Sequence, residues 1–215
     1  FGGAYCEWTT RQSIQLHWIQ LGDITEIFDT LEANGLSTIQ ACGDAWRNIV
    51  GSPVAGRDKK EHVNAWPVIQ SLNETFKGND DHSNLPRKWK VAVTGDTRGS
   101  GQAEINDLGF EPATKEIEGE ATKGFNVTVG GGLARKEPRF ARDIDVFVTP
   151  EEVPEVAGGI SALFRDHGDR ENRFNARIKF LVDEWGPERL RRVLQDDYVD
   201  FELRSAGDDL RDQYS

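Results

Sequence analysis

The sequence predicts an α+β fold, in which short strands and amphipathic helices follow one another along 215 residues. Polar and apolar residues alternate over residues 13–19, which is the period of a half-buried strand. Apolar side chains then recur at helical spacing on one face, at Ile24, Ile27, Phe28 and Leu31. Farther along, Thr149-Pro150-Glu151-Glu152 is a capping box that opens a second helix. Strand and helix periods in one chain of this length favour the α+β class.

The first elements predict a small half-domain over residues 1–43. Asp23 is placed to cap the first helix, and Asn34-Gly35 supplies a left-handed stop. Residues 36–40 are predicted to form the next strand. This strand, helix and strand unit fits a ferredoxin-like half-domain that is incomplete at its N-terminus.

A second domain is predicted over residues 44–197. Residues 44–58 are rich in Gly, Pro and Asn and are expected to form an ordered loop. Helices are expected over residues 61–76, from Thr149 to about Phe164, and from Gly186-Pro187 onward. Strands are expected at residues 89–93, 125–129 and 144–148. Residues 198–215 are polar, acidic and without periodicity, which predicts a linker to a C-terminal half.

Composition argues against two classes of function, nucleic-acid binding and a membrane role. Asp and Glu number 37 against 26 Lys and Arg, and the resulting net charge of −11 would repel a nucleic-acid backbone. No apolar run approaches the roughly 18 residues that a membrane span needs. The sequence therefore predicts neither a nucleic-acid partner nor a membrane location.

Three further features concern the origin of the chain. It has no Met and begins at Phe1, so we expect an internal fragment. The acidic excess, with Arg outnumbering Lys, predicts a protein adapted to high salt. Cys6 and Cys42 lack the spacing of a metal site, which favours a reducing cytoplasm.

Four basic residues stand in strand-like or tight-loop contexts: Arg11, Arg47, Lys88 and Lys90. Lys88 and Lys90 are two residues apart, so on a strand they point to the same face. If the four converge, they make a local anion pocket in an otherwise acidic chain. Taken one at a time, each could equally be a solvated surface residue.

Several segments together resemble the first half of the nitrite and sulfite reductases. The resemblance covers residues 8–198 and rests on five motifs in the family's order: Thr9-Thr10-Arg11-Gln12 with Gln15 and His17; Ala41-Cys42-Gly43-Asp44 with Arg47-Asn48 and Gly51-Ser52-Pro53; Leu85-Pro86-Arg87-Lys88-Trp89-Lys90; Gly124-Phe125-Asn126-Val127 with Gly130-Gly131-Gly132-Leu133; and Phe164-Arg165-Asp166 through Arg170, Arg173, Arg177 and residues 180–183. By this resemblance the fold is a ferredoxin-like half-domain followed by the first siroheme-binding domain.

The resemblance implies roles for individual residues. Arg11, Arg47, Lys88 and Lys90 match the residues that surround the anionic substrate and supply protons. Siroheme, a carboxylate-fringed iron tetrapyrrole, would contact a second set: Gln15, His17, Arg87, Asn126, Gly130, Gly131 and Gly132. We expect the glycine amides to face its carboxylates. An ordinary turn for the glycines and a structural role for His17 remain alternatives, and Arg165, Arg170, Arg173, Arg177 and Lys179 are expected to form a salt-bridged helix.

The family also carries a [4Fe-4S] cluster, which needs four thiolates. This chain has two cysteines, which are too few for the cluster. The resemblance therefore places all of the cluster ligands in an absent C-terminal half. It implies a cytoplasmic, monomeric enzyme that takes electrons from ferredoxin and reduces sulfite to sulfide or nitrite to ammonia. We do not expect the fragment to be active alone.

The substrate and the class of protein stay open. Lys90 and Cys42 favour sulfite, whereas Asn106-Asp107-Leu108 and Pro112-Ala113-Thr114-Lys115 resemble the nitrite enzymes. The alternative from another class is a non-catalytic tetrapyrrole-binding module.

Overall fold

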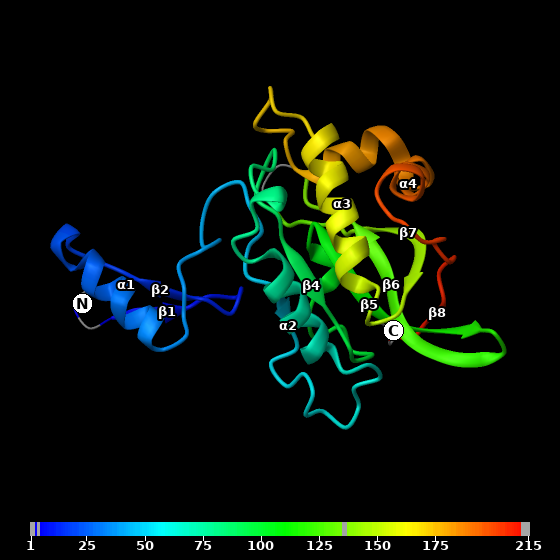
Figure 1. The fold of residues 1–215 in the computed structure, drawn as a ribbon, viewed down its shortest axis with the longest axis horizontal. Coiled ribbons are helices and arrows are strands. Elements are labelled where there is room, and N and C mark those ends of the chain that lie inside the picture. Colours follow the sequence, from blue (N-terminus) through cyan, green and yellow to red (C-terminus); the bar gives the residue numbers. More distant parts are fainter. Residues whose placement is uncertain (1–2, 4, 135–136, 212–215) are drawn as a thin grey trace.

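Residues 3, 5–134 and 137–211 are described by a computed structural model, which contains a small N-terminal unit and a larger sheet-based unit (Figure 1). The small unit is a hairpin of β1 (Cys6–Trp8) and β2 (Ile14–Leu16) with helix α1 (Ile24–Ala33) beside it. It stands to one side, and its hairpin tip points toward the larger unit (Figure 1). Over the described residues, no helix has the length and apolar character that crossing a bilayer requires.

The helix of the small unit is confirmed, and both of its strand predictions need correction. α1 begins after Asp23 and ends before Gly35, whose φ of 71° gives the predicted left-handed stop. The strand predicted over residues 13–19 covers Ile14–Leu16 and is exposed, because the hairpin has little to pack against. Residues 36–40 form no strand, since β2 pairs with β1 instead and Ile39 is 56% exposed.

The larger unit is built on a mixed sheet. Its main strands lie in the order β3 (Val50–Gly51), β4 (Val91–Val93), β5 (Leu108–Ile117), β6 (Glu120–Val129) and β7 (Arg142–Val148). β3, β4 and β5 are parallel, whereas β5, β6 and β7 are antiparallel. The positive φ values of Glu118 and Gly119 close the long β5–β6 hairpin in a two-residue turn.

Strands β4, β6 and β7 match the predicted strands with shifted ends, but β5 was not predicted. Pro112 and the charged residues after it obscure the strand pattern of β5. In the structure, Pro112 lies beyond Phe110, the last residue that pairs with β4, so its missing N–H leaves no bond to that strand unmade.

Three helices cover one face of the sheet: α2 (Ala65–Phe76), α3 (Val153–His167) and α4 (Ile178–Asp197). Their apolar side chains and those of β4 to β7 form one continuous core. α2 begins four residues later than predicted, because residues 62 and 63 bond to the carbonyl of Gly95 and Asn64 caps the helix.

The two later helices, α3 and α4, follow the sequence signals that predicted them. The amide of Thr149 donates to the Glu152 carboxylate at 2.9 Å, as in a capping box, although the helix itself begins at Val153 and runs three residues past Phe164. Gly186, with a φ of 73°, breaks α4, and Pro187 opens its second segment as predicted.

The other face of the sheet is polar and also buried. Alternation along the paired strands places Thr94, Glu111, Asn126 and Thr128 on it. The 3-10 turn Ala103–Ile105 and the end of the chain cover this face, where Arg211 forms an ion pair with Glu111.

The stretch expected to be a linker is packed against the sheet as far as residue 211. Val199 and Leu203 are buried in the core, and β8 (Asp208–Asp209) pairs with β5. Asn126 exchanges two hydrogen bonds with Gly207, at 2.8 and 3.0 Å. Side-chain and backbone bonds of this kind hold the segment in place without a helix or an apolar period, so its sequence pattern did not reveal it.

Candidate functional site

Lys88 and Lys90 flank a fully buried tryptophan, and this alternation sets their direction. Trp89 stacks on Phe164 in the core, and its backbone bonds to Ala45 and Arg47 at 3.0 and 2.8 Å. Since neighbouring residues of an extended segment point to opposite faces, Lys88 and Lys90 point away from the helices. This alternation supports the prediction of a common face, and Arg177 and Asp107 act on the pKa of both lysines.

Arg47 lies on the strand-like segment that bridges to Trp89. Its guanidinium donates to the carbonyls of Ala41 at 3.1 Å and Gly43 at 2.9 Å, and so holds the loop that carries Cys42. The Nε of Arg47 is buried without a hydrogen-bond partner among the described residues.

Arg11 reaches the larger unit from the tip of the β1–β2 hairpin. Its guanidinium donates to Asn106 Oδ1 at 2.9 Å and to the Val91 carbonyl at 3.0 Å. Gln12 beside it donates to the Gly51 carbonyl at 2.7 Å. Burial lowers the pKa of Arg11 to about 10, and nearby Arg47 and Arg177 act in the same direction. Arg11 Nε is a second buried donor without a partner in the described part of the chain.

The four predicted cations lie close enough to affect one another, together with Arg177. Burial lowers the pKa of Lys88, and Arg177, Arg87 and Arg47 lower it further. Burial also lowers the pKa of Lys90, with added repulsion from Arg11, Arg177 and Lys88. We call the set Arg11, Arg47, Lys88, Lys90 and Arg177 the cation cluster.

Asp107 and Arg177 are members of this site that sequence reasoning missed. Asp107 is fully buried at the start of β5, next to Asn106, and its Oδ1 lies 2.6 Å from Arg177 Nη2. The pair spans 70 residues, so no local spacing reveals it. The one available signal was an Asp directly before a buried apolar run, where a carboxylate needs a partner.

The salt-bridged helix predicted around Arg177 is wrong between residues 168 and 177, which form an irregular loop. Arg177 is the N-cap residue of α4, and Arg173 donates to Asp44 at 2.9 and 3.2 Å. Asp44 also accepts from Arg87 at 3.5 Å, which places Arg87 beside the cation cluster. The loop conformation follows from these long-range contacts, which replace the pairs of a helix surface.

The glycine segment lies next to the cation cluster but uses its amides internally. Gly130, Gly131 and Gly132 donate to the carbonyls of Asp107, Asn106 and Arg139 at 2.8 to 2.9 Å. The expectation that these amides face a cofactor's carboxylates is therefore wrong. A side chain on Gly132 would instead meet Arg177 at 3.3 Å, so the glycine leaves room for that guanidinium.

The remaining predicted cofactor residues are not joined to the cation cluster by any hydrogen bond or ion pair that the described residues make. Gln15 is exposed on β2, and His17 Nε2 lies 3.0 Å from Glu7 Oε2 within the same hairpin. Asn126 holds Gly207 on the polar face of the sheet. In this chain His17 and Asn126 have structural partners.

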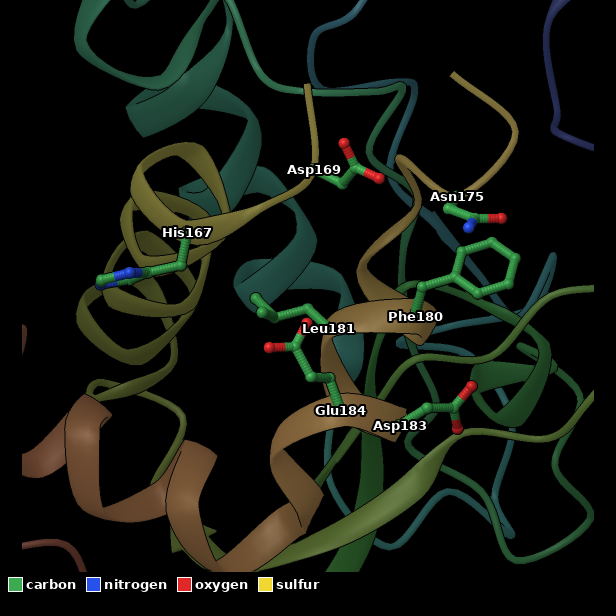
Figure 2. A pocket seen from close by; sticks show the side chains of 7 residues that line it. All are labelled: His167, Asp169, Asn175, Phe180, Leu181, Asp183 and Glu184. Carbon is green, nitrogen blue, oxygen red and sulfur yellow. The ribbon is translucent and has the colours of Figure 1, made fainter. Parts of the chain in front are cut away.

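A cavity of about 530 Å³ lies apart from the cation cluster, between α3 and the start of α4. Figure 2 shows that Asp169, Asp183 and Glu184 contribute carboxylates around it, with Phe180 beside Asn175. Three acidic side chains make this cavity unsuited to an anion, and Asp183 is already paired with Arg139 and Arg142.

The cation cluster fits a large anionic ligand. Four of the five cations interact with the carboxylate of Asp107, and three buried donors of the cluster, Arg177 Nη2 among them, make no hydrogen bond within the described residues. Such a surplus of buried positive charge is costly unless an anion balances it. Cys6 and Cys42 are exposed and unpaired, and the described residues contain no group of three or more His, Cys, Asp or Glu side chains that could hold a metal.

Comparison with known proteins gives the family. The family described as "Nitrite and sulphite reductase 4Fe-4S domain" matches residues 42–202, and "Nitrite/Sulfite reductase ferredoxin-like half domain" matches residues 1–34. An assimilatory ferredoxin-dependent nitrite reductase of Haloferax mediterranei is 50% identical over the whole chain, and a sulfite reductase [ferredoxin] of Mycolicibacterium paratuberculosis is 40% identical over 90% of it. The chain spans 37% and 34% of these two relatives, about a third of their length.

Solved structures agree with this result. The Mycobacterium tuberculosis NirA protein superposes with a TM-score of 0.88 and 34% identity, over 96% of this chain and 37% of that one. Dissimilatory sulfite reductase I shares the fold at a TM-score of 0.68 and 10% identity, over 100% of this chain and 66% of that one. The chain belongs to the nitrite and sulfite reductase family, with a ferredoxin-like half domain followed by its 4Fe-4S domain.

Proposed function

We propose that the protein containing this chain is a ferredoxin-dependent assimilatory reductase that converts nitrite to ammonia or sulfite to sulfide with six electrons. The observation that carries the proposal is the cation cluster, which brings together cations from four separate segments of an acidic protein. The names of the relatives supply the reaction and the electron donor. We propose in addition that the enzyme is a monomer and acts in the cytoplasm.

The cofactors of the proposal are siroheme and a [4Fe-4S] cluster. When bound, siroheme would supply the iron at which the oxyanion is reduced, and the cluster would supply the electrons. Among the residues present, Arg87, Arg177 and the partnerless Nε groups of Arg11 and Arg47 are suited to its carboxylates. Charge-assisted bonds of this type are the strong ones, which suits retention of a cofactor.

The arginines and lysines have different tasks. A guanidinium stays charged at any working pH, so Arg11 and Arg47 hold an anion and orient it. An ammonium group can give up a proton, and burial lowers the pKa of both Lys88 and Lys90 toward the range where transfer is useful. Each oxygen lost as water consumes two protons, which the two Nζ groups can pass on and recover from solvent.

Two observations favour different substrates. Nitrite is favoured by the 50% identity to the Haloferax relative, against 40% to the sulfite reductase named above. Sulfite is favoured by the lysine pair, because a doubly charged anion gains more from two adjacent ammonium groups than a singly charged one. We take nitrite as the first candidate and sulfite as the second.

The cofactor part of the proposal is tested on the complete protein, purified anaerobically after expression with siroheme supply. We expect a siroheme absorption spectrum together with iron and acid-labile sulfide. Pure, folded protein without either group would refute the assignment. Bound siroheme without a cluster and without nitrite or sulfite reduction would instead indicate a tetrapyrrole-binding module.

Lys90→Asn separates the two substrates, because it removes one charge from the lysine pair and keeps a hydrogen-bond donor. We expect kcat/KM for sulfite to fall more than kcat/KM for nitrite, by about tenfold or 1.4 kcal/mol in the ratio. Siroheme occupancy, measured by absorbance, is the control and should not change. Equal losses for both anions would remove the electrostatic reason for considering sulfite.

A further inference from the structure

Asp107 holds two members of the cation cluster by direct contacts. Its Oδ1 accepts from Arg177 Nε at 2.7 Å, and its Oδ2 accepts from the backbone amide of Lys90 at 2.9 Å. Its own carbonyl accepts from Gly130 at 2.9 Å. One residue therefore fixes the guanidinium, the lysine backbone and the glycine segment relative to one another.

Asp107 also supplies negative charge to the cation cluster. Among the described residues, it is the one acidic group that raises the pKa of Arg11, Lys88 and Lys90. The charges that face Lys90 are Arg11 from the hairpin tip, Arg177 from the start of α4, neighbouring Lys88, and Asp107. Lys88 faces Arg177, Arg87, Arg47 and Asp107.

The surroundings of the carboxylate act on it in opposite directions. Burial raises the pKa of Asp107 above its ordinary value, and Arg177 and the Lys90 amide oppose that rise. Both oxygens accept hydrogen bonds, one from a guanidinium and one from an amide N–H, and these contacts favour the ionised form. A buried ion pair of this geometry persists because removing either partner leaves the other charge uncompensated.

We propose that Asp107 is a positioning residue that fixes Arg177 and the Lys90 backbone in place and supplies the buried counter-charge of the cation cluster. Without its charge, each lysine faces only cations, and an ammonium group among cations releases its proton more easily. This inference rests on the proposed function only where the lysine protons are transferred to the substrate. The effect of Asp107 on the lysines can be measured without that reaction.

The test is an NMR titration of the complete protein, with its lysines ¹³C-dimethylated and with no substrate added. Lys88→Arg and Lys90→Arg variants assign the two signals. We expect Asp107→Asn to lower both titration midpoints. Glu111→Gln is the matched control, since it removes another buried carboxylate of β5, and it should leave both midpoints unchanged.

Unchanged midpoints in a folded Asp107→Asn variant would overturn the proposal. If that variant does not fold, Arg177→Gln and the double variant Asp107→Asn with Arg177→Gln replace it, because the double variant leaves a neutral, hydrogen-bonding pair. We expect Arg177→Gln to raise the midpoints and the added Asp107→Asn to lower them again. Equal midpoints in these two variants would also overturn it. A protein that lacks siroheme or reductase activity would refute the proposed function and leave this result standing.

Discussion

Arg47 is the member of the cation cluster whose guanidinium is anchored on a loop, between the carbonyls of Ala41 and Gly43. Charge-assisted hydrogen bonds contribute about 1.5 to 3 kcal/mol each, so Arg47→Ala should weaken oxyanion binding by about tenfold or more. Calorimetric titration of the siroheme-loaded protein measures this. Arg98→Ala, which removes an arginine paired with Asp58 outside the cluster, is the control. Unchanged affinity in a siroheme-replete Arg47→Ala variant would exclude a substrate-holding role.

Glu111 makes stability depend on pH, because burial raises its pKa to about 7. The folded state then binds a proton that the unfolded chain has released, so the free energy of unfolding falls as pH rises from about 4.5 to 7. The loss is roughly 3 kcal/mol by linkage. Glu111→Gln should flatten this fall and be more stable than the parent at pH 8. Denaturant melts at pH 5 and pH 8 compare the two, and parallel pH dependence in both proteins would contradict the assignment.

At the scale of elements, the glycine segment is packed unevenly. A Cβ on Gly131 would lie 2.3 Å from the Glu104 carbonyl and 2.7 Å from that of Asn106, whereas one on Gly132 would meet only the end of the Arg177 side chain. Gly131→Ala should therefore destabilise the fold by about 1 to 3 kcal/mol, and Gly132→Ala by much less. Thermal melts of the two variants provide the comparison. Equal stability of both would show that the segment can shift.

The elements that sequence reasoning recovered are those with local signals. α1, α3 and the second segment of α4 were predicted from a Gly stop, a capping box and a Gly-Pro start, which act within one helical turn, whereas the predicted Asp23 side-chain cap is not made. β5 and the packed end of the chain were not, because their strand pairing and ion pairs are made with distant residues. The false strand at residues 36–40 shows the converse, since a strand-like segment without a pairing partner stays irregular.

The site residues divide in the same way, into those identified by a motif and those held by distant contacts. Motif resemblance identified Arg11, Arg47, Lys88 and Lys90, and the structure brings these four together. It did not identify Asp107 and Arg177 as a pair, because a contact over 70 residues has no local spacing. The glycine amides were misjudged because their carbonyl partners lie in another segment.

At the scale of the whole molecule, the net charge of −11 and the 37 acidic residues predict a response to salt. At molar ionic strength the Debye length falls to about 3 Å, so repulsion between surface carboxylates is largely screened. The melting temperature should therefore rise between low and molar potassium chloride. Potassium glutamate tests whether screening is responsible, since it should raise the melting temperature as well. A melting temperature that is constant or falls with salt would contradict a halophilic adaptation.

The order of synthesis limits when the hairpin tip that carries Arg11 can dock on the larger unit. Arg11, Arg47, Lys88 and Lys90 are all synthesised before Asp107, and Arg177 follows 70 residues later. Until Asp107 is in the chain, four like charges would have to meet without a counter-charge, so docking of the hairpin on Asn106 and Val91 cannot precede it. We therefore expect the tip to remain undocked on a nascent chain until Asp107 has been added, and anions in the surrounding solution to hasten its docking afterwards.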